Sequence, residues 1–340
     1  MIVYIGNMMS KHGGSVGVIE TLSQRFAARH TVVAVSDKKS QAIRLLHMLY
    51  TIFKHRKVCQ VVLIDSYSTM AFWYTYLAAW LCRRLTIPYI PILHGGMFPS
   101  RLQQSPRSTR KVFSNAYANV SPSRYLKEAF EKEGYQVQFI PNSIDLEAYS
   151  FIERSHLKPT LLWVRSFHEI YNPQMAVEVL NLACKKYPEA TLCMVGGDKD
   201  GSMGKVQQLA KEHDLAKQVK FTGFISKTEW IALSKDYDIF INTTNADNQP
   251  VSLIEAMALG FPIISTNPGG VPFLVNEGKD ALLVDVDDAI GMSEAIFSLL
   301  ENEGKAKSLS QHSREKAETF AWSHVQHSWW KLLEMDGLGE

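Results

Sequence analysis

The sequence predicts an α/β protein built from two doubly wound, Rossmann-like domains. Short β-branched runs alternate with longer helical patterns from the first residue, and the runs are continuously apolar, as buried parallel strands are. The length of 340 residues and the hydrophobic share of 46% favour two cores of roughly 150 residues each. Strand periodicity lapses over residues 142–159. We therefore expect one domain over 1–150, a second over 158–319, and a cleft between them.

The first domain is predicted to hold six strands with helices between them, including helices near 14–29, 39–56 and 123–134. The strands are expected at IVYIG (2–6), TVVAVS (31–36), VCQVVLID (58–65), PYIPILHG (88–95), YANVS (117–121) and QVQFIPN (136–142). The uncharged run 66–82 approaches the length of a bilayer span. Its Ser, Thr and Tyr content and its place directly after a strand favour a packed helix.

The second domain repeats the alternation. Its strands are expected at TLLWVR (160–165), ATLCMVGG (190–197), QVKFTGF (218–224), DIFINTT (238–244), FPIIST (261–266) and ALLVDV (281–286). A last helix, FAWSHVQHSWWKLLEM, carries more aromatic residues than the end of this domain needs. We expect residues 320–340 to cross back and pack on the first domain.

Charge divides the chain more sharply than its net value of +2 indicates. Residues 1–150 hold 18 Lys and Arg against 8 Asp and Glu, and the remainder holds 18 against 26. A basic half suggests an anionic partner such as a membrane surface, a phosphorylated acceptor or nucleic acid, and scattered surface lysines are the alternative. The chain has no recognisable nucleic-acid module, so nucleic acid is not expected.

The cysteines and the first residues of the sequence indicate in which cellular compartment the protein is expected. The four cysteines have no CxxC spacing and indicate reduced core thiols. The opening MIVYIGNMM has the pattern of a strand and not of a secretory signal, so a cytoplasmic location is expected.

The junction after strand 238–244 has the layout of an anion site. Pro250 fits a first helical turn, and the backbone amides of Val251, Ser252 and Leu253 can point at a phosphate. Glu255 lies a turn further on, where it could accept hydrogen bonds from vicinal hydroxyls such as those of a ribose, although an ordinary helix acid is the simpler interpretation.

Three other stretches are candidates for binding. Gly13 and Gly14 lie between the first strand and its helix, where a phosphate can approach the backbone, but there is no complete GxGxxG and dinucleotide binding is disfavoured. His94 ends a strand before two glycines and should face the cleft, unless it is simply a packed histidine. The triplet 198–200 reads Asp-x-Asp, a pattern that can hold a divalent metal, and no spacing suggests zinc.

Taken together, these segments resemble the retaining glycosyltransferases of family 4, which have the two-domain GT-B fold. The resemblance rests on two acids eight positions apart, Asp247 and Glu255, followed by AMALGFPIIST and NPGGVP. HGG, VSPSRYLKEAF, FIPNSIDLEAY, WVRSF, CMVGGD and FTGFISKTEW occur in the matching order. It covers nearly the whole chain, and the ordered set is specific although each motif alone is weak.

The resemblance implies a role for each matching residue. Glu255 would bind the ribose of a nucleotide sugar, Asp247 would contact hydroxyls of the transferred sugar, and Arg165 would hold the diphosphate. Gly197 and Phe224 would lie beside the nucleotide. Asp247 stands where the family more often has Glu, which shifts the carboxylate by about 1.5 Å and leaves the sugar open.

One departure concerns the diphosphate. The family usually has a lysine about five residues after the arginine, whereas this chain reads RSFHEIYNP, with Ile170 and Tyr171 there. Tyr171 could donate a hydrogen bond instead, and Asn172 could cap a helix that starts at Pro173.

The resemblance also implies the reaction. A hexose-type sugar would pass with retention from a nucleotide diphosphate sugar, UDP being favoured over GDP, to a saccharide or lipid-linked saccharide acceptor, without cofactor or metal. The setting would be bacterial cell-surface polysaccharide, lipopolysaccharide or glycolipid synthesis. A nucleotide-sugar epimerase of the same fold and an inactive membrane-surface binding relative are the alternatives.

The basic first domain is expected to meet the acceptor. The helix at 42–57 ends in a basic cluster, and a second basic patch contains Arg101, Arg107, Arg110 and Lys111. Together they suggest peripheral association with an anionic bilayer at the inner face of the plasma membrane. The apolar face of the 42–57 helix is expected to pack mainly on the sheet.

Overall fold

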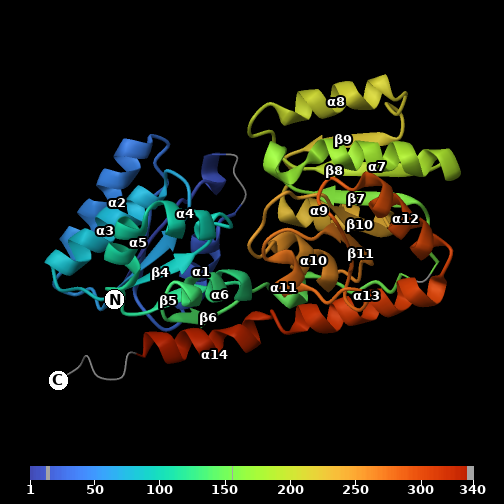
Figure 1. The fold of residues 1–340 in the computed structure, drawn as a ribbon. Helices are drawn as coiled ribbons and strands as arrows, with labels where there is room; N and C mark the ends of the chain where they lie inside the picture. Colours follow the sequence, from blue (N-terminus) through green and yellow to red (C-terminus); the bar gives the residue numbers. More distant parts are fainter. Residues whose placement is uncertain (13–15, 155, 335–340) are drawn as a thin grey trace. The chain divides into compact units, whose positions relative to one another are not determined.

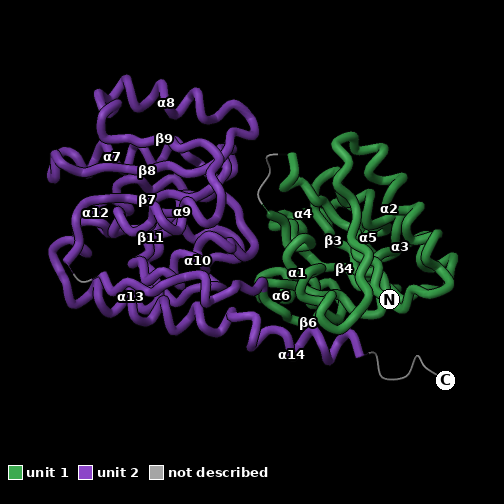
Figure 2. Tube along the Cα trace, turned by 180° about the vertical axis from the view of Figure 1, so that it is seen from behind, with its two compact units in different colours: residues 1–141 green, residues 142–340 purple. Residues whose placement is uncertain are grey.

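The computed structural model describes residues 1–12, 16–154 and 156–334. The chain forms two compact units, Met1–Pro141 and Asn142–Glu340, which Figure 2 distinguishes by colour. Each unit contains a six-stranded sheet whose neighbouring strands all pair in parallel. The parallel order explains why the strand segments are apolar throughout, since helices cover both faces of such a sheet.

Unit 1 has the strand order β2-β1-β3-β4-β5-β6 (Figure 1). Its strands are β1 (Ile2–Ile5), β2 (Val32–Val35), β3 (Val61–Ser66), β4 (Tyr89–Leu93), β5 (Asn119–Ser121) and β6 (Val137–Phe139). Its helices are α1 (Val18–Phe26), α2 (Gln41–His55), α3 (Phe72–Arg84), α4 (Phe98–Gln104), α5 (Pro106–Phe113) and α6 (Arg124–Lys132). Buried side chains of α2 to α6 share one core on one face of the sheet.

Unit 2 has the strand order β12-β11-β10-β7-β8-β9. Its strands are β7 (Thr160–Val164), β8 (Thr191–Val195), β9 (Val219–Gly223), β10 (Ile239–Asn242), β11 (Ile263–Thr266) and β12 (Leu282–Val284). Its helices are α7 (Pro173–Lys186), α8 (Ser202–Glu212), α9 (Lys227–Leu233), α10 (Val251–Ala258), α11 (Val271–Leu274), α12 (Ala289–Leu300), α13 (Glu303–Glu318) and α14 (Trp322–Leu333).

Alternating side chains of the central strands build two cores in unit 2. Leu161 and Trp163 face the core under α7 and α12, whereas Leu162 faces the core under α10. All twelve strands that the sequence predicts are present within a few residues of their expected bounds. Continuous apolar runs therefore located the buried strands correctly.

The boundary between the units lies earlier than the expected 150. Residues 142–154 bond to unit 2: the Ile144 N–H donates to Phe320 O, and the Trp322 N–H donates to Ile144 O. The buried Arg154 guanidinium donates to the carbonyls of Leu259 and Ser234. The segment expected as a join is thus tied into the second unit by its backbone and by one buried cation.

The carboxyl end of the chain is helical as expected, since α14 spans Trp322–Leu333. Packing of residues 320–340 on the first domain stays a prediction, and 335–340 lie outside the described residues. The uncharged run 66–82 contributes to α3 on the sheet. Throughout the described ranges, no helix is long and apolar enough to cross a membrane.

Each sheet has a point where the strand order reverses. In unit 1 the chain builds outward from β1 to β2 and then returns to β3 on the other side of β1. In unit 2 it builds from β7 to β9 and then returns to β10 beside β7. Ligands of open α/β sheets bind outside the carboxyl ends of strands at such a reversal, so these two places position the sites described next.

Candidate active site

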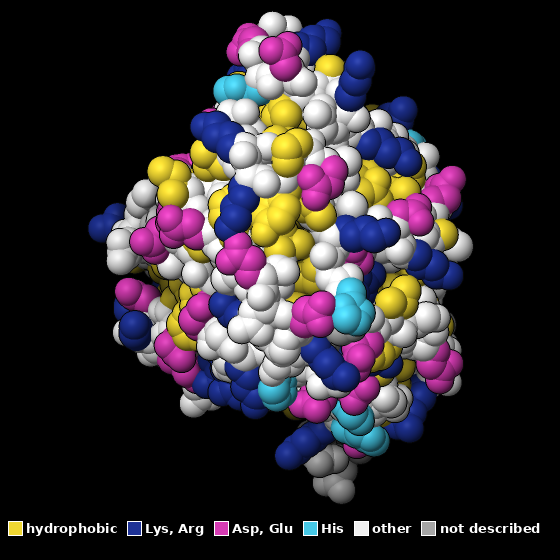
Figure 3. All heavy atoms as spheres, turned by 90° about the vertical axis from the view of Figure 1, so that its right-hand side faces the viewer, with side chains coloured by type: hydrophobic (Ala, Val, Ile, Leu, Met, Phe, Trp, Pro, Cys, Tyr) yellow, Lys and Arg dark blue, Asp and Glu magenta, His cyan; other side chains and the backbone are white. Residues whose placement is uncertain are grey.

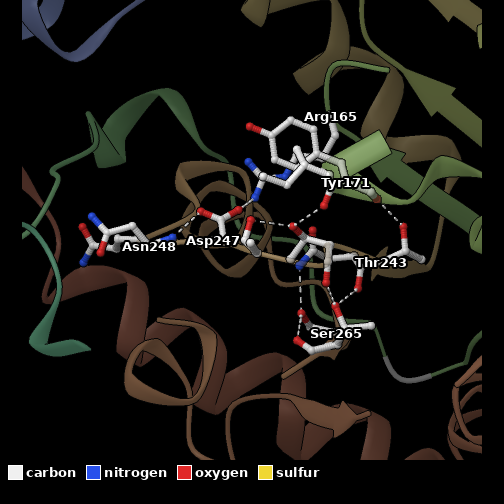
Figure 4. A network of polar contacts seen from close by, with 12 residues as sticks. Arg165, Tyr171, Thr243, Asp247, Asn248 and Ser265 are labelled. Carbon is white, nitrogen blue, oxygen red and sulfur yellow. Dashed lines mark hydrogen bonds and ion pairs between the residues drawn. The ribbon is translucent and has the colours of Figure 1, made fainter. Parts of the chain in front are cut away.

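The reversal in unit 2 brings together residues from the ends of β7 and β10. Arg165 follows β7, and Asp247 lies in the loop between β10 and α10. Figure 4 shows the two side chains pointing at one another. The Arg165 Nη2 forms an ion pair with Asp247 Oδ2, and both side chains are largely buried. Sequence reasoning placed both residues in the site but did not foresee that they pair.

Surrounding groups hold this pair in place. Asp247 Oδ1 accepts the Asn248 N–H at 2.8 Å. The Tyr171 ring lies 4.6 Å from the Arg165 guanidinium carbon and stacks on it (Figure 4). Burial lowers the pKa of the Arg165 guanidinium, and the charges of Tyr171 and Glu255 act in the opposite direction. A cation and an anion of low exposure thus balance each other where the two strands end.

Stacking on Arg165 is a contact of Tyr171 that the sequence did not suggest, and donation by its hydroxyl to a diphosphate stays a prediction. Tyr171 belongs to a 3₁₀ turn, Glu169–Tyr171, that is tied to the end of β10. The Thr243 hydroxyl donates to Tyr171 O at 2.8 Å and accepts the Trp163 indole N–H at 3.0 Å. Asn172 caps α7 as predicted, accepting the Met175 N–H at 3.4 Å. The aromatic ring takes the place where the resemblance expects a lysine.

Close backbone contacts at glycines set the loop around Asp247. Gly269 has φ +57°, and a Cβ there would lie 2.4 Å from Asp247 O. A Cβ on Gly270 would lie 1.6 Å from Asn248 O, and the Gly270 N–H donates to Asp247 O at 3.0 Å. Only glycine permits this approach, so the NPGG segment supports the acid from behind.

Glu255 lies on α10 with 6% of its surface exposed. Its Oε1 accepts the Tyr149 hydroxyl at 2.7 Å and lies 2.6 Å from Lys227 Nζ. Lys227 is the first residue of α9, directly after β9, and its side chain is half exposed. Sequence reasoning missed Lys227 and Tyr149, which lie far from Glu255 along the chain. The available signal was that both lie inside motifs of the resemblance, Lys227 in FTGFISKTEW and Tyr149 in FIPNSIDLEAY.

The start of α10 differs slightly from expectation. The helix begins at Val251, so Pro250 is its N-cap and not part of the first turn. The Leu253 N–H already donates to Pro250 O at 3.1 Å, which corrects its assignment as a phosphate donor. Val251 and Ser252 occupy the first two helical positions, whose amides have no intrahelical acceptor. The Ser252 hydroxyl is buried and has no partner among the described residues.

The glycine turn after β8 lies beside the β9–α9 loop. A Cβ on Gly197 would lie 3.5 Å from the Phe224 Cβ, and Phe224 is 53% exposed. The structure thus brings together the two residues assigned to the nucleotide. A Cβ on Gly196, where φ is +154°, would collide with Arg165 O at 1.7 Å.

The carboxylates of the Asp-x-Asp triplet bond to local backbone. Asp198 accepts the Gly201 N–H at 2.9 Å, and Asp200 accepts the Ser202 and Glu169 N–H groups at 3.0 and 2.9 Å. The Ser202 hydroxyl also donates to Asp200 and is the main cause that lowers the pKa of Asp200 to about 2. Within the described ranges, no group of three or more His, Cys, Asp or Glu residues is arranged to hold a metal.

Unit 1 carries its own polar cluster at its reversal. His94 follows β4, and its Nε2 lies 3.0 Å from Asp65 Oδ1 on β3. Asp65 is 4% exposed and also accepts the Tyr4 hydroxyl at 2.8 Å. Asp65 and Tyr4 were not foreseen, because a lone acid inside an apolar strand gives no motif. Gly13 and Gly14, assigned to phosphate binding, lie outside the described residues.

Comparison with known families gives two matches that together cover most of the chain. The profile of "Glycosyl transferases group 1" matches residues 147–316, and that of "Glycosyltransferase Family 4" matches residues 6–148. The first includes the Arg165, Asp247 and Glu255 positions, and the second includes His94.

Individual relatives match over shorter regions. The chain is 26% identical over 187 residues to spore coat protein SA of Bacillus subtilis, covering 53% of this chain and 49% of that protein. It is 24% identical over 177 residues to a D-inositol 3-phosphate glycosyltransferase of Corynebacterium jeikeium, covering 51% and 42%. The matched region spans about half or less of these curated relatives.

A solved structure matches over nearly the full length. The Anabaena protein HepE, in complex with UDP-glucose, superposes with a TM-score of 0.81 at 15% identity, covering 98% of this chain and 99% of that one. This similarity confirms the expected fold class, two Rossmann-like α/β domains of the GT-B type.

Proposed function

Since the chain belongs to the family described as glycosyl transferases group 1, we propose that it is a retaining hexosyltransferase. It moves a sugar from a UDP-sugar to a saccharide or lipid-linked saccharide acceptor in cell-surface polysaccharide, lipopolysaccharide or glycolipid synthesis. The observation that carries the proposal is the convergence of Arg165, Asp247 and Glu255 at the strand reversal of unit 2. The complexes of HepE with UDP-glucose and relatives named as glycosyltransferases support it.

In the proposed donor complex, Glu255 accepts hydrogen bonds from the ribose hydroxyls through the carboxylate that Tyr149 and Lys227 hold. Gly197 and Phe224 line the nucleotide. Arg165 binds the diphosphate, for which its planar guanidinium fork is suited, together with the first amides of α10. Binding requires Arg165 to exchange Asp247 for phosphate oxygens, and this exchange releases Asp247 to contact the hydroxyls of the sugar.

The reaction in this proposal breaks the bond between the anomeric carbon and the diphosphate oxygen. The acceptor oxygen bonds to the same face of that carbon, and its proton passes to an oxygen of the departing diphosphate. Arg165 and the helix amides stabilise the charge that develops on the leaving group. The site holds the reactants in position, and no side chain is assigned as a covalent nucleophile.

We also propose that the donor site works without a metal ion or other cofactor. Arg165, Lys227 and the start of α10 supply positive charge to the diphosphate in place of a divalent cation. In unit 1, His94 contacts the transferred sugar or the reacting oxygens, with its ring oriented by Asp65.

The protein would act at the inner face of the plasma membrane as a peripheral protein. The excess of basic residues in the first 150 positions supports an anionic surface as its partner. A lipid-linked acceptor would be reached from that surface.

The test is a transfer assay with UDP-sugars and a panel of saccharide and lipid-linked acceptors, with and without EDTA. NMR coupling at the new anomeric centre assigns its configuration. Retention, insensitivity to EDTA and loss of product in Glu255→Gln support the proposal, with the exposed Glu294→Gln as matched control. Inversion would contradict retention. Donor conversion without any acceptor would favour an epimerase.

A further inference from the structure

Helix α2 carries apolar side chains on its solvent side. Ile43, Leu46, Tyr50 and Phe53 are 55%, 66%, 61% and 49% exposed, and their spacing of three, four and three places them along one stripe. Met48 and Ile52 of this helix pack in the core on the sheet, together with the partly buried Leu49. The expected packing of one apolar face on the sheet is therefore present, and the structure adds a second apolar stripe that faces outward.

Helix α3 extends the same surface. Trp73 and Trp80, seven residues apart, are 43% and 45% exposed. The two helices lie side by side in Figures 1 and 2, and the Tyr74 hydroxyl bonds to Gln41 O. Because both helices cover the same face of the sheet, their exposed sides point the same way. We name the six side chains the α2–α3 ridge: Ile43, Leu46, Tyr50, Phe53, Trp73 and Trp80.

Basic residues are concentrated in the part of the sequence that contains the ridge. Residues 38–127 contain fourteen Lys and Arg and a single acid, Asp65, which is buried against His94 and Tyr4. Of the fourteen, Lys38 pairs with Asp37, Lys127 pairs with Glu131, and Arg44 is buried. Both helices end in basic residues. Helix α2 ends with Lys54 and His55 and is followed by Arg56 and Lys57, and α3 ends with Arg83 and Arg84. By contrast, the unit 2 face shown in Figure 3 carries basic and acidic side chains intermixed.

Cations also stack on the aromatic side chains of the ridge. The Arg56 guanidinium carbon lies 4.0 Å from the Phe53 ring centre, and that of Arg84 lies 5.7 Å from the Trp80 ring. Aromatic and aliphatic side chains flanked by Lys and Arg are what a helix presents when it lies in the interface of an anionic bilayer. Trp and Tyr are the residues enriched at headgroup depth.

We propose that the α2–α3 ridge is a docking surface for an anionic lipid bilayer. The apolar side chains enter the headgroup and acyl boundary while the surrounding Lys and Arg contact lipid phosphates. The proposal specifies the contact surface of the peripheral association stated above, and it rests on that part of the proposed function alone. A second copy of the chain is disfavoured as occupant, because two identical basic surfaces repel each other. The aliphatic side chains of Ile43 and Leu46 in the ridge disfavour nucleic acid, which stacks on aromatic rings.

Flotation with vesicles tests the proposal without donor or acceptor. The probes are vesicles of phosphatidylcholine alone and vesicles that also contain phosphatidylglycerol. We expect binding to the second kind, weakened at high salt, and a blue shift of tryptophan emission on binding. Leu46→Glu with Tyr50→Glu, and separately Lys54→Glu with Lys57→Glu, should each weaken binding about tenfold or more.

Matched controls in unit 2 are Ile290→Glu, which replaces a side chain that is 65% exposed, and Lys211→Glu. Both should bind like the wild type. Circular dichroism and UDP calorimetry on the ridge variants check that the fold and the donor site are intact. Failure of the ridge proposal is thereby separated from failure of the transferase proposal.

Three results would overturn it: no vesicle binding by the wild type, equal binding by the ridge variants, or equal binding to neutral vesicles. A concentration-dependent dimer that Leu46→Glu with Tyr50→Glu makes monomeric would assign the ridge to a second copy instead. Ridge-dependent binding of duplex or single-stranded nucleic acid, without vesicle binding, would assign it to that partner.

Discussion

Arg165 and Asp247 form an ion pair that joins the ends of β7 and β10. Lys227 and Glu255 form a second pair in the same unit, so each cation of the site is matched by a carboxylate. Under the proposed function, the anionic diphosphate of the donor competes with the two carboxylates for the cations. The two ion pairs would then set the affinity for the donor and would open when the donor binds.

Asp247→Asn should uncouple donor binding from transfer. Arg165 then keeps a buried charge without its carboxylate, so the melting temperature of the free protein falls and UDP restores it. Affinity for UDP rises because the phosphate no longer competes with Asp247, whereas turnover falls because a contact to the sugar is lost. Calorimetry, thermal melting and a transfer assay measure the three effects, with the exposed Asp236→Asn as control. Unchanged UDP affinity would show that the pair does not open for the diphosphate.

Lys227→Met should weaken UDP binding about tenfold, as expected for loss of one hydrogen bond to a charged group. The comparison with uridine decides its role. If Lys227 contacts phosphate, the variant loses affinity for UDP and keeps its affinity for uridine. Equal losses for both ligands would mean that Lys227 acts by holding Glu255 at the ribose. The exposed Lys217→Met is the matched control.

Gly270→Ala should damage the site from behind Asp247. The new Cβ meets Asn248 O at 1.6 Å, so the loop must move. We expect the free energy of unfolding to fall by about 1–3 kcal/mol. The transfer activity of the protein that remains folded should also fall. Gly204→Ala is the control, because a Cβ on this helical glycine of α8 meets nothing within 4 Å and should be neutral or stabilising. Normal transfer activity of Gly270→Ala would show that the close approach of Gly270 to the Asp247 loop is not needed for catalysis.

The thiols should react in an order set by burial. Burial raises the pKa of all four thiols, so access of the reagent sets the order, and Cys82 and Cys193 are fully buried. Cys59 and Cys184 are only partly buried. Native labelling at pH 8 followed by mass spectrometry should modify Cys59 or Cys184 before the other two, and denatured protein should yield four thiols. Early labelling of Cys193 would mean that the sheet of unit 2 opens readily.

Much of the architecture follows from the sequence because buried parallel strands are recognisable as apolar runs. Arg165, Asp247 and Glu255 could be grouped because the carboxyl ends of parallel strands meet at one edge of a sheet. The residues that pair with them could not be predicted from the sequence. Lys227 reaches Glu255 from another helix, and Asp65 reaches His94 from a neighbouring strand, so no spacing along the chain relates them.

Helix orientation was the other gap. Helix α2 carries apolar residues on two stripes, one with Met48 and Ile52 and one with Leu46 and Tyr50. Periodicity identifies such a helix but does not say which stripe the sheet takes. Only the fold shows that the second stripe faces solvent.

The most direct test of the donor site is a calorimetric titration of wild type and Glu255→Ala with UDP-, GDP-, ADP- and CMP-sugars, with and without EDTA. The account predicts saturable binding of UDP-sugars by the wild type, unchanged by EDTA and lost in Glu255→Ala. If Glu255→Ala still binds the nucleotide sugar, the nucleotide does not bind at Glu255 of α10. Failure of every nucleotide sugar to bind would contradict the assignment of this cluster as a donor site.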